Sequence, residues 1–123
     1  MAACGDTFLC GDDEFDDYHL NVIITPPSGG EVVTVSVMTL RKKSEKLVRL
    51  QPSEHEFLTR ESVVPFIYSR IRKVADIDSA IQADNVGREP VTPELLERIR
   101  KGFLESEFTP NGVRQFYKFV MGL

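Results

Sequence analysis

The sequence contains two histidines, and each lies where a side chain could reach a substrate. His19 opens "HLNVIIT", an apolar, β-branched run that predicts a buried strand, and it follows an acidic segment that predicts a loop. An imidazole at such a strand end can exchange a proton near neutral pH. His55 lies in "PSEHEF", a predicted loop between two strands. The simpler alternatives are a hydrogen-bonded imidazole at the core edge for His19 and a solvated loop residue for His55.

A threonine and several basic residues could complete a site that acts on a phosphate. Thr39 lies at the exit of the strand predicted for residues 31–40, and Arg70 lies in "SRIRK". Alone, such a threonine commonly bonds to the backbone, and such an arginine is commonly solvated. The densest group of cations is in the turn after that strand: Arg41, Lys42, Lys43, Lys46 and Arg49. We interpret this group as a candidate phosphate-binding surface, with a solvated loop as the alternative.

The net charge of −4 conceals a segregation along the chain. Residues 1–40 contain no lysine or arginine and seven acids, whereas residues 41–73 contain nine lysines and arginines and four glutamates. The basic middle would attract phosphates and the acidic front would repel them. The total charge therefore does not decide whether the chain binds nucleic acid.

The sequence predicts neither a metal site nor a cofactor. Five carboxylates lie between residues 12 and 17, but they lack the glycine and the ligand spacing of a calcium loop. Cys4 and Cys10 lie in a segment predicted to be extended, about 20 Å apart, which is too far for a disulfide. We expect both thiols to be reduced.

No apolar run is long enough to cross a membrane, and the N-terminus lacks the pattern of a signal peptide. We therefore expect a cytosolic protein that does not interact with membranes. Its length allows one domain with a real core.

The periodicity of the first part of the chain predicts an antiparallel sheet. Val33, Val35 and Val37 alternate with polar residues, as in a strand with one buried face. Pro65 should place its strand at an edge or force a bulge, and the acidic segment 11–18 should form a solvated loop. Strands are predicted at residues 5–10, 19–25, 31–40, 47–52 and 62–68.

Three helices are predicted after residue 75. Thr92 and Thr109 each precede a proline, which is the pattern of a helix N-cap followed by proline at the first helical position, and Asp76 is a candidate N-cap for the first helix. The fold class is therefore α+β. We expect a small antiparallel barrel or curled sheet (1–74) and a helical extension (75–123) packed on it as one compact unit.

Taken in order, "GDTFLC", "HLNVIIT", "EVVTVSVMTL", "RLQPSEHEFLTRESVV" and "SRI" resemble the MazF/PemK-like toxin family, in particular a divergent branch with histidine at the head of the second strand. The likeness covers residues 4–72. It implies an SH3-like barrel, a homodimer, and an antitoxin-controlled endoribonuclease that cuts single-stranded RNA without a metal.

The resemblance also assigns candidate site residues. The family's threonine at the end of the third strand corresponds to Thr39, and its arginine at the head of the second strand is replaced by His19. An imidazole offers fewer donors than a guanidinium, so Arg41 or Arg70 would supply the missing charge. On the barrel, His19, Thr39, His55 and Arg70 are expected to converge at one end of the sheet.

A second hypothesis is a non-catalytic interaction module. The same barrel would then be a scaffold that binds a basic protein partner through its acidic loop and pairs with a second chain through a sheet edge.

Overall fold

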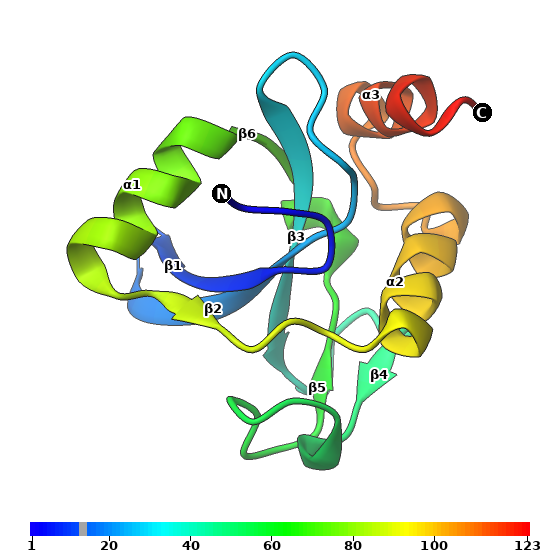
Figure 1. Cartoon of the computed structure of the whole chain (residues 1–123). Coiled ribbons are helices and arrows are strands. Elements are labelled where there is room, and N and C mark those ends of the chain that lie inside the picture. Colours follow the sequence, from blue (N-terminus) through cyan, green and yellow to red (C-terminus); the bar gives the residue numbers. More distant parts are fainter. Residues whose placement is uncertain (13–14) are drawn as a thin grey trace.

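The computed structural model describes the backbone of residues 1–12 and 15–123, and all of their side chains except those of residues 12 and 15–17. This part of the chain is an α+β fold in which three helices pack around an antiparallel sheet (Figure 1). The strands are β1 (Thr7–Asp12), β2 (Phe15–Ile23), β3 (Glu31–Thr39), β4 (Arg49–Leu50), β5 (Ser62–Val63), β6 (Arg70–Lys73) and β7 (Gly87–Arg88). The helices are α1 (Val74–Asp84), α2 (Pro93–Glu105) and α3 (Asn111–Met121), with single 3-10 turns η1 (Pro52–Glu54) and η2 (Phe66–Tyr68).

The described strands form one sheet in the order β4-β5-β3-β2-β1-β7, and β6 pairs with β3 as well. Within the described residues the two end strands, β4 and β7, do not pair with each other. The predicted α+β class with an antiparallel sheet is confirmed. A closed barrel stays a prediction.

Strand β3 is the centre of the sheet and matches the strand predicted for residues 31–40. It pairs with β2 through Leu20↔Val37, and on its other side with β5 and β6. The valines of its predicted core face are buried against α2 and α3. This position places Thr39, its last residue, at the sheet's end beside β5.

The prediction of a solvated loop over residues 11–18 is wrong for its described backbone. Strand β1 continues to Asp12 and β2 begins at Phe15, so the segment extends the β1–β2 hairpin. The physical reason is that strand pairing needs backbone hydrogen bonds and does not require buried side chains. The remaining two residues, Asp13 and Glu14, lie outside the described part.

The strand predicted for residues 62–68 is interrupted at Pro65. Val63 pairs with Met38, and Arg70 pairs with Thr34, so β5 and β6 both follow β3 but with a shifted register. The 3-10 turn η2 fills the interval. Proline has no backbone N–H to donate to a strand, so the ladder breaks there.

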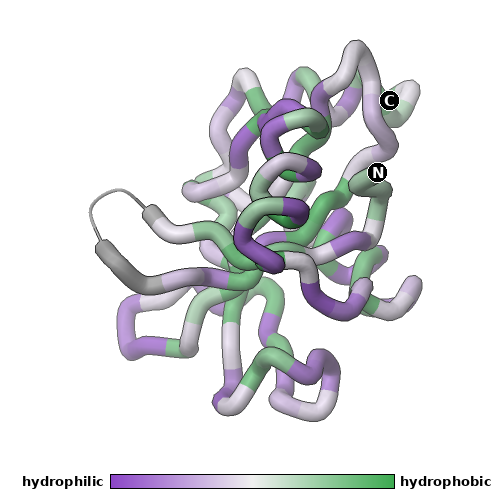
Figure 2. The backbone as a smooth tube through the Cα atoms, turned by 60° about the vertical axis from the view of Figure 1, so that its left-hand side comes forward, coloured by the Kyte–Doolittle hydropathy of each residue, from purple (hydrophilic) through white to green (hydrophobic). Residues whose placement is uncertain are grey.

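Two core clusters lie on opposite faces of the sheet. On one face, Ile99 and Phe103 of α2 pack against the β2 and β3 residues and against Tyr117 of α3. On the other, Val74 and Ile77 of α1 pack against β1 and β3. Figure 2 shows hydrophobic segments through the middle of the molecule and hydrophilic ones at its periphery. No helix in the described part is long and apolar enough to span a membrane.

One predicted helix cap is confirmed and two are wrong. Thr92 caps α2, and its hydroxyl accepts the N–H of Leu95 at 3.2 Å. Thr109 instead donates to the carbonyl of Phe103 at 2.7 Å, so α3 begins one residue later than predicted, after Pro110. The first helix starts at Val74, before Asp76, because β6 continues directly into α1 without a loop.

Candidate functional site

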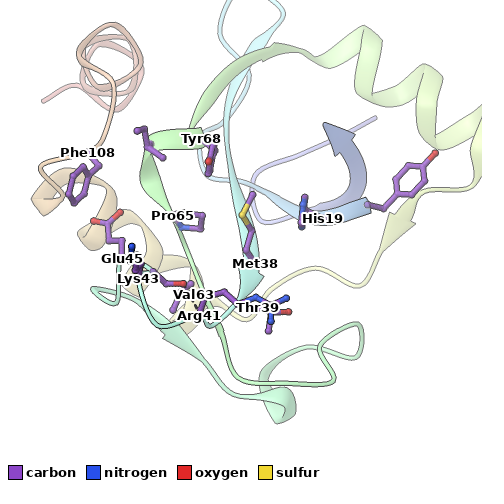
Figure 3. A pocket seen from close by; sticks show the side chains of 13 residues that line it. His19, Met38, Thr39, Arg41, Lys43, Glu45, Val63, Pro65, Tyr68 and Phe108 are labelled. Carbon is purple, nitrogen blue, oxygen red and sulfur yellow. Dashed lines mark hydrogen bonds between the residues drawn. The ribbon is translucent and has the colours of Figure 1, made fainter. Parts of the chain in front are cut away.

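A cavity of about 730 Å³ opens beside the middle of β2 and the end of β3, between the loop 41–45, β5 and η2 (Figure 3). Its volume is in the range of small-molecule and nucleotide sites. Its lining divides into a polar part, an apolar rim and one anchoring carboxylate.

The polar part contains two of the predicted catalytic residues. His19 was predicted at the head of its strand but lies in the middle of β2, because the strand extends back to Phe15. Thr39 ends β3, and both side chains are partly exposed. Leu20 and Val37 are opposite each other in the β2–β3 ladder and are buried in the core, so strand alternation turns His19 and Met38 to the other face, toward the cavity.

Two cations of the predicted phosphate-binding group also line the cavity. Arg41 and Lys43 are exposed and belong to the loop that follows β3. The loop is a tight turn, in which the N–H of Arg41 donates to the Ser44 hydroxyl at 2.9 Å. The cavity therefore combines an imidazole, a hydroxyl, a guanidinium and an ammonium group.

The rim of the cavity is apolar and exposed. Phe108 and Ile67 are each 55% exposed, Tyr68 is 45% exposed, and Tyr18 of β2 is exposed as well. In Figure 3, Phe108 and His19 lie on opposite sides of the cavity, with Pro65 and Met38 between them. Exposed rings beside a polar pocket are suited to stacking on a flat ligand such as a base.

A glutamate that the sequence did not single out holds the walls together. One carboxylate oxygen of Glu45 accepts the N–H of Phe66 at 3.0 Å, and the other accepts the hydroxyl of Ser106. The same hydroxyl accepts the N–H of Phe108 at 3.1 Å. Glu45 thus joins the basic loop to η2 and to the segment that carries Phe108. Within "RKKSEK" it looked like an ordinary charge in a polar turn, so no local signal marks it.

His55 lies away from the cavity. It is 4% exposed, its Nδ1 accepts the N–H of Phe57 at 3.0 Å, and its Nε2 lies 2.6 Å from the carbonyl oxygen of Glu89. The imidazole that satisfies both contacts carries its proton on Nε2. The hydroxyl of Thr7 donates to the same carbonyl at 2.7 Å. His55 therefore joins its loop to β1 and to the segment after β7.

The other predicted residues, Arg70, Lys42 and Lys46, lie outside the cavity wall. Arg70 begins β6 opposite Thr34 and is exposed, but it is not part of the cavity wall. Lys42 is exposed on the loop without lining the cavity. Lys46 lines a neighbouring groove along α2. Of the four predicted catalytic residues, His19 and Thr39 both line the cavity, although strand alternation places Thr39 on the same face as Val37, and His55 and Arg70 lie elsewhere.

The described residues contain no group of three or more histidine, cysteine, aspartate or glutamate side chains that could hold a metal ion. Cys4 and Cys10 are free thiols, as predicted. Burial raises the pKa of Cys4, although Arg100, which donates to its sulfur at 2.9 Å, acts in the opposite direction.

No protein-family model and no curated protein sequence matches the chain. The resemblance to the MazF/PemK-like toxins therefore stays a prediction from the quoted motifs.

Proposed function

We propose that the protein is a MazF/PemK-like endoribonuclease that cuts single-stranded RNA by attack of a 2′-hydroxyl on the adjacent phosphorus. The observation that carries the proposal is the shared cavity of His19, Thr39, Arg41 and Lys43. The chemistry of these groups matches the needs of this reaction, and the cavity is large enough for a nucleotide.

The reaction needs a base, an acid and positive charge. The 2′-oxygen loses its proton and bonds to phosphorus, while the bond from phosphorus to the 5′-oxygen breaks and that oxygen gains a proton. The products are a 2′,3′-cyclic phosphate and a 5′-hydroxyl. Between these states the phosphorane carries extra negative charge, which fixed donors and cations stabilise.

We assign a role to each polar residue of the cavity. His19 exchanges the proton, because an imidazole can act as base or acid near neutral pH. The hydroxyl of Thr39 donates a hydrogen bond to a non-bridging phosphate oxygen. Arg41 supplies the guanidinium charge, because it lines the cavity and Arg70 does not. Lys43 adds a second cation. The rings of Tyr68 and Phe108 stack on the bases beside the scissile phosphate.

The SH3-like barrel, the homodimer, the control by an antitoxin and the action on cytoplasmic RNA are parts of the same proposal. They follow from the resemblance over residues 4–72, and the antiparallel sheet with its central β3 supports only the architectural part.

The test is cleavage of a mixed-sequence single-stranded RNA by the purified protein at low salt in EDTA. We expect cutting with 2′,3′-cyclic phosphate ends, and no cutting of the same strand with 2′-O-methyl groups. Thr39→Val, which keeps the shape and removes the hydroxyl, should lower the rate about 10²- to 10³-fold by loss of one donor.

Intact RNA after incubation with folded protein would refute the ribonuclease. The second hypothesis, a non-catalytic module that binds a basic protein partner, would then gain support from a salt-sensitive complex with such a partner.

A further inference from the structure

A second concave surface lies directly beside the cavity. This α2 groove, of about 380 Å³, is formed by residues 46–49, which include β4, and by α2. Four of its lining residues are cations: Lys46, Arg49, Arg98 and Lys101. Glu105 is the acidic residue among the lining residues.

The groove has a fixed floor because α2 approaches the strand segment closely. A Cβ atom placed on Gly102 would lie 2.4 Å from Cγ2 of Val48, so only glycine allows this packing. Arg98 and Lys101 lie one helical turn apart and therefore project from the same side of α2. The close contact thus holds the helix cations facing those of residues 46–49.

The two arginines are held in place by hydrogen bonds. Arg98 donates to the carboxylate of Glu54 and to the carbonyl of Arg49. Arg49 forms an ion pair with Glu61 at 3.4 Å. A guanidinium has five N–H groups, so Arg98 keeps donors for a further ligand.

The two lysines carry the positive charge of the groove that lies outside its ion pairs, and Glu105 contributes one negative charge. The ammonium of Lys46 donates to the carbonyls of Lys42 and Ser44 at 2.8 and 3.1 Å, which orders it without neutralising it. Among the described residues, neither Lys46 nor Lys101 forms an ion pair. Two ordered arginines and two unpaired lysines around one groove suit an anion with several oxygens.

The groove is continuous in sequence with the cavity. Residues 43–45 line the cavity, and Lys46 is the first residue of the groove. Consecutive residues of the basic loop therefore line the two surfaces. Helix α2 lies outside residues 4–72, so the resemblance does not account for Arg98 and Lys101.

We propose that the α2 groove binds backbone phosphates of the RNA strand whose scissile bond lies in the cavity. The inference rests on the proposed function for the identity of the strand. It adds a second contact region that sets how strongly longer strands bind.

The experiment measures binding of fluorescent 2′-O-methyl RNA, which lacks the attacking hydroxyl, over a salt series. Each lost phosphate contact on a single strand lowers the salt slope by about 0.7, so Lys46→Ala/Lys101→Ala should lower it by about 1.4. Over a fourfold rise in salt, the wild-type protein should then lose about sevenfold more affinity than the variant.

Strand length and a matched variant make the test specific. With a strand of about 12 nucleotides the groove variant should bind more weakly, whereas a strand of about 3 nucleotides, which fills only the cavity, should bind both proteins equally. Lys73→Ala/Lys118→Ala removes two exposed lysines outside both the cavity and the groove. It should leave the slope unchanged.

The outcomes separate this inference from the ribonuclease. Equal binding of the long strand by the wild-type protein and the groove variant, or an equal loss in the matched variant, would overturn the groove assignment alone. Strong groove-dependent binding with no cutting of unmodified RNA would support the groove and refute the enzyme. An acidic peptide that displaces the long strand at lower concentration than unlabelled RNA would overturn RNA as the ligand.

Discussion

The two histidines occupy opposite kinds of environment. His19 lies at the wall of an open cavity with Thr39 and Arg41, whereas His55 is buried and both of its ring nitrogens have hydrogen-bond partners. A side chain whose donors and acceptors are all used holds structure together and has no capacity left for a substrate. We therefore expect the cavity region to decide activity and the His55 region to decide stability.

The largest expected effect is the loss of activity in His19→Ala. Removing the proton-transfer group should lower the cleavage rate about 10²- to 10⁴-fold. Because the cavity is open to solvent, free imidazole in the buffer should restore part of the rate. The measurement is single-turnover RNA cleavage with and without imidazole.

The stability of the His19→Ala variant is the control for its loss of activity. His19 is only partly exposed but lies outside the core clusters, so the unfolding free energy should change by less than about 0.5 kcal/mol. A variant that cuts RNA at the wild-type rate would remove His19 from the mechanism.

The second prediction is that His55→Ala lowers stability and leaves catalysis unchanged, the opposite of His19→Ala. The change leaves the N–H of Phe57 without its acceptor and opens a cavity, while the carbonyl of Glu89 keeps Thr7 as donor. We expect a loss of about 2–4 kcal/mol in the free energy of unfolding. Urea denaturation measures the loss.

The cleavage rate of His55→Ala, measured under conditions in which the variant is folded, decides whether His55 takes part in catalysis. The rate per folded molecule should equal that of the wild type, and imidazole should not change it. A rate loss as large as that of His19→Ala in a folded variant would bring His55 back into the catalytic set.

Local patterns in the sequence predicted the elements that position the cavity. The alternation of Val33, Val35 and Val37 predicted β3. Pro65 predicted an edge strand or a bulge, and the structure instead interrupts the strand between β5 and β6. Thr92 with its following proline predicted the start of α2. Each of these signals acts within a few residues, which is the range that a single sequence reveals.

Contacts between distant segments account for what could not be predicted. The hydrogen bonds of Glu45 to Phe66 and Ser106 cross from the loop to two other segments, and β7 pairs with β1 at the far end of the chain. His55 likewise contacts Thr7 and Glu89, which are distant from it in sequence. The neighbours of these residues in sequence are polar, so nothing local predicted their burial or their partners.

One aromatic residue from the cavity rim and one from the His55 loop offer a third test of the comparison. Phe108→Ala removes a ring from the cavity rim and should weaken RNA binding about 5- to 100-fold, as expected for one stacked base. Phe57→Ala removes a partly exposed ring from the His55 loop and should leave binding unchanged. Binding of 2′-O-methyl RNA measures both. Equal effects of the two variants would contradict stacking in the cavity.

The smallest effect concerns the stability of the His55 region at low pH. Burial acts to raise the pKa of the Glu54 carboxyl in η1. The hydrogen bonds from Arg98 and from the N–H of Gln51 outweigh burial and hold this pKa below the ordinary value of 4.5. A carboxyl whose pKa is lower in the folded state stabilises the protein above its ordinary pKa. This contribution is lost as the pH falls through the lowered pKa.

Glu54→Gln should therefore reduce the free energy of unfolding near neutral pH by less than about 1 kcal/mol, because the side chains of the pair are 26% and 47% exposed. The difference from the wild type should vanish in acid. Glu56→Gln, on an exposed neighbour, is the matched control and should change little at either pH. If Glu54→Gln differs from the wild type equally at neutral and acidic pH, the ion pair with Arg98 does not stabilise the loop, and the stability of the His55 region depends on its buried hydrogen bonds alone.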